Sequence, residues 1–358
     1  MQKIDQMLGT TKWNSSIYSG ALNQYTYPGN KEFGNLLKFL QQINPAQQSR
    51  IHITDVCDWH MPDPDPNFDI YIVCAFGEFV NEDYCDSLSK QFPDRTLILL
   101  TSQYYNPCNL ENFTVFTIEH LHTSVRFFEP QNYLPLAQRA YLHATQSRRN
   151  ALHKSLITAQ LISRFSDLQY TFCNRKTNEY QLETFQQDLQ KTLAISCSES
   201  DIDAVVALHN DPREIPGDDL DITPHYTQCK LFWTTESIFL SRESCPTAYL
   251  TEKTLKPIVC GSAWIVAGQK HSYRRIQELG FETFESEFNI DFDELNDQDR
   301  INAVYKSMDR DFDHLLNNSS IQDKIDYNYS YFFGDFVSAV EKQNLPKIQK
   351  FIDYVNTL

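Results

Sequence analysis

The amino-acid sequence predicts an α/β fold organised in two domains. Short runs rich in Ile, Val and Leu alternate with polar stretches of helical character, and this alternation occurs in two series along the chain. The runs are nearly continuous rather than interrupted by polar residues, which is typical of parallel strands covered on both faces. The length of 358 residues suits two domains of ordinary size. We expect the first domain at 1–150, the second at 151–325, and C-terminal helices at 326–358 that could pack back on the first domain.

Four apolar runs predict the strands of the first domain, and a polar stretch between two of them predicts a helix. The expected strands lie at 50–56, 68–76, 95–102 and 113–120, and the expected helix at 82–93. The following stretch, 131–165, has a long helical periodicity, so we expect it to form the connection between the two domains.

The second series predicts the second domain. Residues 199–221 hold eight Asp or Glu together with Pro212, Pro216 and Gly217, which favours an acidic surface excursion. The expected strands lie at 168–176, 229–237, 263–268 and 281–284, and the expected helices at 180–194, 251–261, 271–280 and from 297 onward. Strands that alternate with helices in this way indicate parallel sheets, whose ligands lie at the carboxyl ends of the strands.

Composition excludes several classes of protein. The chain has only 10 glycines and contains neither GxGxxG nor GxxxxGK[ST], which excludes the Rossmann fingerprint, the P-loop and the kinase glycine loop. The net charge of −16 argues against a protein that wraps nucleic acid by charge alone. The nine cysteines are scattered without a CxxC pair, so we interpret them as reduced, buried thiols.

The chain is expected to be a soluble, cytoplasmic protein, acting in the host cytoplasm if it is viral. No apolar run approaches the length needed to span a bilayer, and the polar start lacks the apolar stretch of a signal peptide. The densest basic group lies on an expected helix, where a solvated helix face is the favoured interpretation. Its members are Arg139, Arg148, Arg149, His153 and Lys154.

Residues 249–253, Tyr-Leu-Thr-Glu-Lys, carry the clearest candidate site. Thr251 is a good N-cap residue, so Glu252 and Lys253 would occupy the first turn of a helix. The free N–H groups and the positive dipole of such a turn favour a phosphate, and Lys253 adds a mobile charge. Glu252 suits the hydroxyls of a ribose, and Tyr249 could pack on a base. Ordinary helix capping explains the same residues and stays open as the alternative.

The surrounding block, 229–284, resembles the donor-binding region of α1,3-fucosyltransferases and their viral and bacterial relatives. That family has an apolar strand ending in a Phe-Glu-Asn-Ser-like motif, then Tyr-x-Thr-Glu-Lys, a helix, a Gly and a second apolar strand. This chain has Thr235-Glu236-Ser237, Tyr249 to Lys253, Gly261 and then Ala263 to Val266. The forms Thr-Glu-Lys-Thr-x-Lys-Pro and Glu-Leu-Gly-Phe-Glu-Thr-Phe resemble phage-encoded members.

The resemblance implies a GT-B fold of two facing Rossmann-like domains with a helical C-terminal segment. It implies an inverting glycosyltransferase that uses a GDP- or UDP-linked sugar as donor and requires no metal or other cofactor. Carried over to this sequence, it implies the following contacts: Glu252 with the ribose, Lys253 with the diphosphate, Tyr249 with the base or ribose, Thr251 in the same turn, Glu236 in the donor pocket, and Arg175 with Lys176 as a second basic contact.

The general base is not assigned by the resemblance. Relatives place a Glu in a Thr-Gly-Glu-like motif, whereas this chain has Gln103 at the nearest counterpart, and an amide cannot accept the proton. The alternatives are Asp55, Asp58 and Glu78, which follow strands of the first domain. We favour Glu78, because it follows the most hydrophobic strand, where partial burial could raise its pKa. The group formed by Asp55, Asp58 and His60 could also suggest a metal site, but capping and solvation explain it more simply.

Several functions stay open at the level of sequence. As an enzyme, the chain could glycosylate a saccharide or glycan, or a hydroxymethylated pyrimidine in phage DNA. DNA as acceptor would need a basic groove, for which Arg139, Arg148, Arg149 and Lys154 are the candidates. The alternatives are a non-catalytic, nucleotide-sugar-binding relative that has lost the general base, and an unrelated α/β protein in which the Tyr-x-Thr-Glu-Lys motif arose by chance.

Overall fold

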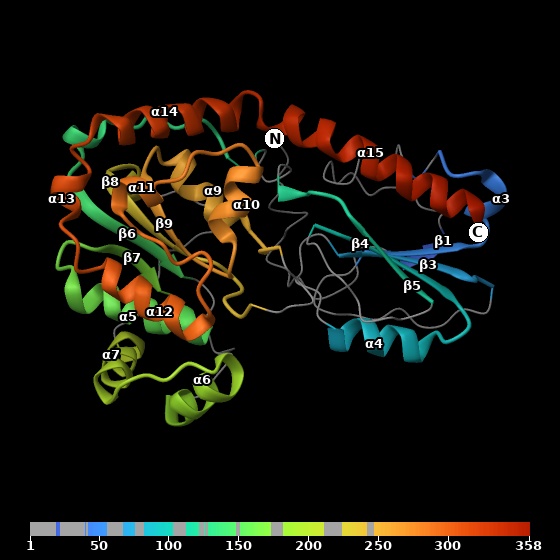
Figure 1. The fold of residues 1–358 in the computed structure, drawn as a ribbon, viewed down its shortest axis with the longest axis horizontal. Coiled ribbons are helices and arrows are strands. Elements are labelled where there is room, and N and C mark those ends of the chain that lie inside the picture. Colours follow the sequence, from blue (N-terminus) through green and yellow to red (C-terminus); the bar gives the residue numbers. More distant parts are fainter. Residues whose placement is uncertain are drawn as a thin grey trace. The chain divides into compact units, whose positions relative to one another are not determined.

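A computed structural model gives the fold, which is α/β as predicted (Figure 1). It describes residues 19–21, 40, 42–55, 67–75, 82–102, 112–121, 125, 128–147, 151–172, 182–210, 224–241 and 247–358. The chain divides into two compact units, one made of Met1–Thr123 with Val340–Leu358 and the other of Ser124–Ala339. Each unit has its own sheet of mainly or entirely parallel strands.

The first unit is built on a five-stranded sheet in the order β1-β2-β3-β4-β5. Its strands are β1 (Ser19–Ala21), β2 (Ile51–Asp55), β3 (Ile70–Ala75), β4 (Thr96–Thr101) and β5 (Phe113–Thr117). β2 to β5 are parallel and follow the chain in order, while β1 pairs with β2 in the antiparallel direction. The four strands predicted for this part of the chain are therefore confirmed.

Helices cover both faces of this sheet within the first unit, α4 (Glu82–Gln91) on one side and α15 (Phe336–Thr357) on the other (Figure 1). The apolar core under α15 joins side chains of β2 to β5 to Phe351, whose ring centroid lies 5.3 Å from that of Phe116. Asn344 pairs with both backbone groups of Glu119, at 2.8 and 2.9 Å, and so continues the hydrogen bonding beyond β5. The far end of the chain therefore completes this core.

The borders of the units differ from the domain borders expected from the sequence. The border expected after residue 150 falls inside the second unit, because the strand before it pairs within the second sheet. The segment expected at 326–358 is divided: α14 (Ser319–Phe333) packs against a helix of the second unit, whereas residues from Val340 on belong to the first.

The second unit has a four-stranded parallel sheet in the order β7-β6-β8-β9. Its strands are β6 (Tyr141–Ser147), β7 (Gln169–Phe172), β8 (Cys229–Thr235) and β9 (Ala263–Ala267). β6 was not expected: the helical interpretation of 131–165 is wrong for its first half and holds only for α5 (Leu152–Arg164). β6 pairs with neighbours on both sides, and this non-local pairing outweighs a helical pattern in the local sequence.

Two more expectations for this unit are corrected. Residues 199–210 form a helix, α7 (Glu199–Asn210), which packs on α5 and whose Asp201 accepts a 2.5 Å hydrogen bond from Gln160. The rest of the predicted excursion, 211–221, lies outside the described residues. The helix dipole stabilises the acidic residues of the first turn of α7, Glu199 and Asp201. The acidic residues that suggested an excursion are therefore also suited to the start of a helix. Residues 281–284 form no strand; Phe281 and Phe284 are buried there and pack against Tyr331 and Trp264.

The remaining predicted helices are present. They are α6 (Phe185–Leu193), α9 (Glu252–Val259), α10 (Ser272–Glu278), α12 (Asp297–Ser307), α13 (Phe312–Leu315), α14 and α15. Among the described helices, none combines the length and the apolar composition needed to cross a bilayer. Of the five cysteines in the described part of the chain, only Cys197 is partly exposed, as expected for buried thiols.

α5 and α9 cover opposite faces of the second sheet. On β6, Ser147 contacts Thr158 of α5, whereas the preceding residue, Gln146, contacts Lys256 of α9. Successive residues of a strand point to opposite faces, so the two helices lie on opposite sides. The face toward α5 holds His143, which is buried against Phe165 and accepts a hydrogen bond from Trp233 at 3.2 Å.

Replacing Phe351 with Ala is expected to destabilise the first unit by about 3–5 kcal/mol, because the change leaves a cavity beside β5. Amide hydrogen exchange of β2 to β4, followed with increasing urea, measures this loss. Leu345→Ala, at a position that is 52% exposed on the same helix, is the matched control and should have little effect. Equal losses in the two variants would contradict the packing of α15 on this sheet.

The second unit is expected to lose stability as the pH falls from 6.5 to about 4. Burial lowers the pKa of His143 from 6.5 to about 4, so in this range the unfolded chain binds a proton that the folded chain does not. The cost reaches about 3 kcal/mol at the lower end. The free energy of unfolding, measured by chemical denaturation at several pH values, should depend less on pH in His143→Gln than in the native chain. The exposed His314→Gln is the control, and a profile unchanged by His143→Gln would contradict the prediction.

Candidate functional site

The candidate site lies at the carboxyl edge of the second sheet, beside the point where the strand order reverses. The chain passes from β6 to β7 on one side and returns to β8 on the other side of β6. In α/β sheets, ligands bind beyond the carboxyl ends of the strands at such a reversal. Glu236 follows β8 directly, and Thr251 begins α9, so both lie at this edge.

The carboxylate of Glu236 is completely buried and is held by donors from the start of α9. One oxygen accepts the Thr251 N–H at 3.2 Å and the Thr254 hydroxyl, and the other accepts the Thr251 hydroxyl at 2.6 Å and the Ser237 N–H at 3.1 Å. The Glu236 N–H donates to Ala267 O at 3.0 Å, so its backbone continues the pairing of β8 with β9. The side chain thus joins the end of the sheet to the start of a helix.

The first turn of α9 has the predicted cap, and several of its N–H groups already have partners within the protein. Thr251 is the N-cap, and its hydroxyl accepts the Lys253 N–H at 3.4 Å, which confirms the capping prediction. The Thr251 N–H is taken by Glu236, and the Thr254 N–H by the Thr251 carbonyl. Protein groups thus accept the N–H groups of Thr251, Lys253 and Thr254. That this turn binds a phosphate stays a prediction, which also rests on the helix dipole and on the Lys253 ammonium.

Glu252 and Lys253 form an ion pair at the mouth of this turn, with Lys253 Nζ 2.8 Å from Glu252 Oε1. Their side chains are 24% and 18% exposed, so a ligand could reach both. Burial alone would raise the pKa of Glu252, but the charges of Lys253 and Lys256 outweigh it and lower the pKa to about 2. Glu252 is therefore a carboxylate at neutral pH and serves only as a hydrogen-bond acceptor.

A second cation, Lys256, lies deeper along the same helix. It is 4% exposed, and its Nζ donates to Gln146 Oε1 of β6 at 2.6 Å. Lys256 thus links α9 to β6, the strand at which the strand order reverses. Its charge also lowers the pKa of Glu252, one helical turn earlier. The sequence analysis assigned no role to Lys256. Its position four residues after Glu252 places both side chains on the same side of the helix, which could have indicated their interaction.

The loop between Glu236 and Tyr249 is fastened to the end of β9. Gln269 accepts the Tyr249 N–H at 2.8 Å and donates to Leu240 O, also at 2.8 Å. The buried Arg300 donates to Gly268 O at 2.9 Å and to Phe239 O at 2.7 Å. Side chains of Gln269 and Arg300 therefore bind the backbone at both described ends of this loop.

Tyr249 and His153 both contribute to the wall of the site. The Tyr249 side chain is 7% exposed, so little of its ring is open to a ligand. His153, from the first turn of α5, donates from Nε2 to Glu236 O at 2.8 Å and stacks on Phe239. Burial lowers the pKa of His153 to about 3, so it is neutral at physiological pH.

The structure brings together one part of the predicted site. Glu236, Tyr249, Thr251, Glu252 and Lys253 gather at the carboxyl edge of the second sheet. Asp55 is the last residue of β2, in register with Cys74, in the first unit. Arg175, Lys176, Asp58, His60, Glu78 and Gln103 lie outside the described residues.

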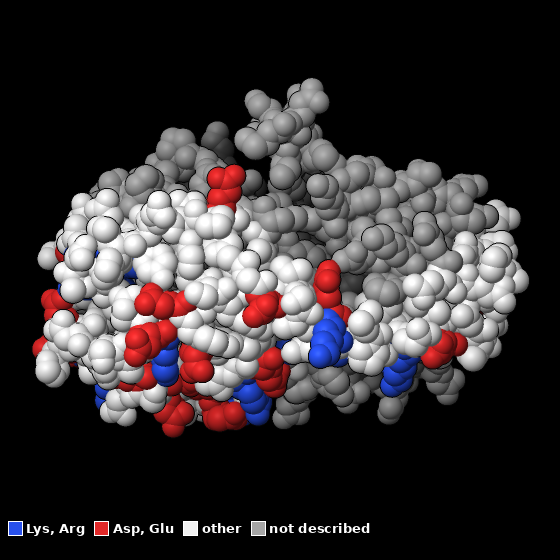
Figure 2. All heavy atoms as spheres, turned by 90° about the horizontal axis from the view of Figure 1, so that it is seen from above, with Lys and Arg blue, Asp and Glu red and all other residues white. Residues whose placement is uncertain are grey.

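The basic group expected on a solvated helix face is wrong for the three members that the structure describes. Arg139 precedes β6 and is 5% exposed, and its guanidinium donates to Cys229 O at 2.7 Å and to Gly261 O. His153 and Lys154 are also buried, while Arg148 and Arg149 lie outside the described residues. On the face drawn in Figure 2, carboxylates clearly outnumber Lys and Arg among the coloured residues. The two described cations of the proposed DNA groove, Arg139 and Lys154, are therefore not exposed to bind DNA.

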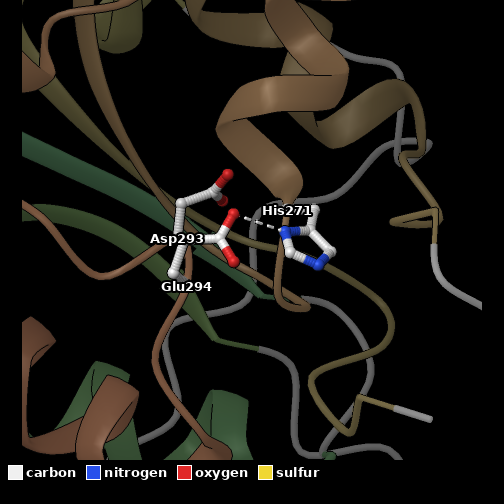
Figure 3. Close-up of side chains that lie close together, drawn as sticks. All are labelled: His271, Asp293 and Glu294. Carbon is white, nitrogen blue, oxygen red and sulfur yellow. Dashed lines mark ion pairs between the residues drawn. The ribbon is translucent and has the colours of Figure 1, made fainter. Parts of the chain in front are cut away.

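One group of possible metal ligands occurs in the described part of the chain: His271, Asp293 and Glu294 (Figure 3). Asp293 uses both oxygens to accept N–H groups of α10, at 2.9 and 3.1 Å. Glu294 pairs with His271 at 2.9 Å and lies within 4 Å of Lys270 and Arg274. Two neighbouring cations oppose a further positive charge. We therefore interpret the group as an ion-pair cluster that caps α10.

Neither models of known protein families nor curated proteins match this chain.

Replacing Thr251 with Ala is expected to destabilise the second unit by about 1–2 kcal/mol, because the turn loses its cap and the donor to Glu236. Chemical unfolding measures the change. Thr251→Ser keeps a hydroxyl and should retain most of the stability. If Ser and Ala cost the same, the hydroxyl contacts do not hold this turn.

Proposed function

We propose that the chain is an inverting glycosyltransferase of GT-B type, which transfers a sugar from a nucleotide diphosphate sugar to an acceptor hydroxyl. One observation carries the proposal: an accessible Glu252–Lys253 pair begins a capped helix at the carboxyl edge of a parallel sheet. This arrangement agrees in order with the resemblance, from the strand through Glu236 and the helix to Gly261 and the next strand. The presence of two α/β units supports the same proposal.

In this proposal the Lys253 ammonium binds the diphosphate, and the Glu252 carboxylate accepts hydrogen bonds from the ribose hydroxyls. Because the two side chains pair with each other at 2.8 Å, the donor must separate them. Glu252 then keeps the charge of Lys256 nearby, so its carboxylate stays ionised. Tyr249, which is nearly buried, forms the wall beside the ribose or base.

The reaction needs a base and a stabilised leaving group. The base removes the proton of the acceptor hydroxyl while its oxygen attacks the anomeric carbon, and the bond from that carbon to the diphosphate breaks. Lys253, together with Arg175 and Lys176, would balance the charge of the departing diphosphate without a metal. Glu78 is the proposed base, with Asp55 and Asp58 as alternatives.

A saccharide or glycan hydroxyl is the proposed acceptor in preference to DNA. The buried positions of Arg139 and Lys154 remove two of the four cations that a DNA groove would need. The net charge of −16 also opposes binding to a polyanion.

Lys253→Ala is expected to weaken the binding of GDP or UDP about 10- to 100-fold, because it removes the ammonium that pairs with the diphosphate. Isothermal titration calorimetry measures the affinity. Lys230→Ala is the matched control: Lys230 also pairs with a carboxylate, at 3.2 Å, but lies near the start of β8, away from the carboxyl edge. Equal losses in both variants would contradict the proposed diphosphate contact.

A transfer assay with a panel of nucleotide sugars and acceptor saccharides tests the reaction itself. Failure of the native chain to bind either nucleotide would contradict the proposed function. Binding without transfer or hydrolysis would instead support the non-catalytic relative that has lost its base.

A further inference from the structure

We infer that Glu236 is a positioning residue, whose buried carboxylate fixes the first turn of α9 so that Glu252 and Lys253 face the donor. The inference rests on the proposed function and changes the role that the resemblance implies for Glu236, which is direct contact with the donor. It also assigns a role to Thr254, whose hydroxyl is the second side-chain donor to this carboxylate.

The first step of the inference is accessibility. Glu236 is 0% exposed, whereas Glu252 and Lys253 are 24% and 18% exposed in their side chains. Both oxygens of Glu236 already accept two hydrogen bonds each from the protein. A donor molecule would therefore meet Lys253 and Glu252 and would not reach the carboxylate behind them.

The second step is the way in which the carboxylate fixes the turn. Its bonds to Thr251 and Thr254 hold two residues three apart, which is one turn of the helix. Its own backbone is anchored to β9 through Ala267 O and to α5 through His153. The direction in which α9 leaves the sheet, and with it the direction of Lys253, is thereby set by Glu236.

The third step is the charge. A carboxylate at a helix start is favoured by the dipole and can accept all of these donors at once. An amide in its place would turn an NH₂ group toward N–H and hydroxyl donors. Glu236→Gln should therefore loosen the turn although its size is conserved.

The test compares Thr254→Val, which removes the hydroxyl at nearly constant volume, with Thr254→Ser, which keeps it. Calorimetry with GDP and UDP should show affinity about 5- to 10-fold lower for Thr254→Val and largely restored for Thr254→Ser. Thr145→Val is the matched control, since Thr145 is equally buried but donates to Trp233 O on the other face of the sheet. It should cost stability and leave nucleotide affinity unchanged.

Hydrogen exchange without ligand gives a second readout, which does not depend on the proposed function. Amides of residues 252–256 should exchange faster in Thr254→Val and Glu236→Gln than in the native chain or in Thr145→Val. Unchanged exchange would overturn the positioning role whether or not nucleotides bind. If amides exchange faster in the two variants but the native chain binds no nucleotide, the first turn of α9 does depend on Glu236 and the proposed function is contradicted. Faster exchange with unchanged nucleotide affinity would overturn the inference while leaving the function intact.

Discussion

The buried carboxylate of Glu236 is the interaction on which the candidate site depends. Moving a carboxylate out of water costs several kcal/mol unless donors replace the lost hydration. Here the donors come from Ser237 and from two threonines at the start of α9. Apolar replacements of buried ionic groups are often neutral or stabilising, so we infer that this carboxylate matters more for the conformation of the turn than for stability.

Other side chains around the site also bind backbone carbonyls. Gln269 and Arg300 bind backbone carbonyls of the loop that follows Glu236, and His153 binds the carbonyl of Glu236 itself. Glycine-rich turns let the backbone approach a phosphate closely, and a chain with 10 glycines lacks that option. Side chains that reach across to the backbone bind the carboxyl edge of this sheet instead.

The sequence predicted the features that depend on neighbouring residues. Strands with continuous apolar runs and the Thr251 cap were predicted correctly, because both depend on residues that are adjacent in the sequence. β6 was missed, since its polar His143 and Gln146 belong in a strand only because partners lie on both sides. Arg139 and Lys154 look like surface cations in sequence, yet the fold buries them. Glu236 was identified as a site residue, but its burial and its donors depend on two segments that meet only in the folded chain.

The placement of α15 has a consequence for the order in which the protein can fold during synthesis. Thr114 and Tyr354, whose hydroxyls lie 3.0 Å apart, are separated by 240 positions in the chain. β2 to β5 leave the ribosome before α15, so the part of their core that α15 supplies is missing until the whole second unit has followed. The second unit can close its own core first, because its strands and helices are continuous in the chain. Until α15 emerges, the apolar side chains of β2 to β5 that pack on it in the folded chain are available for aggregation and for chaperones.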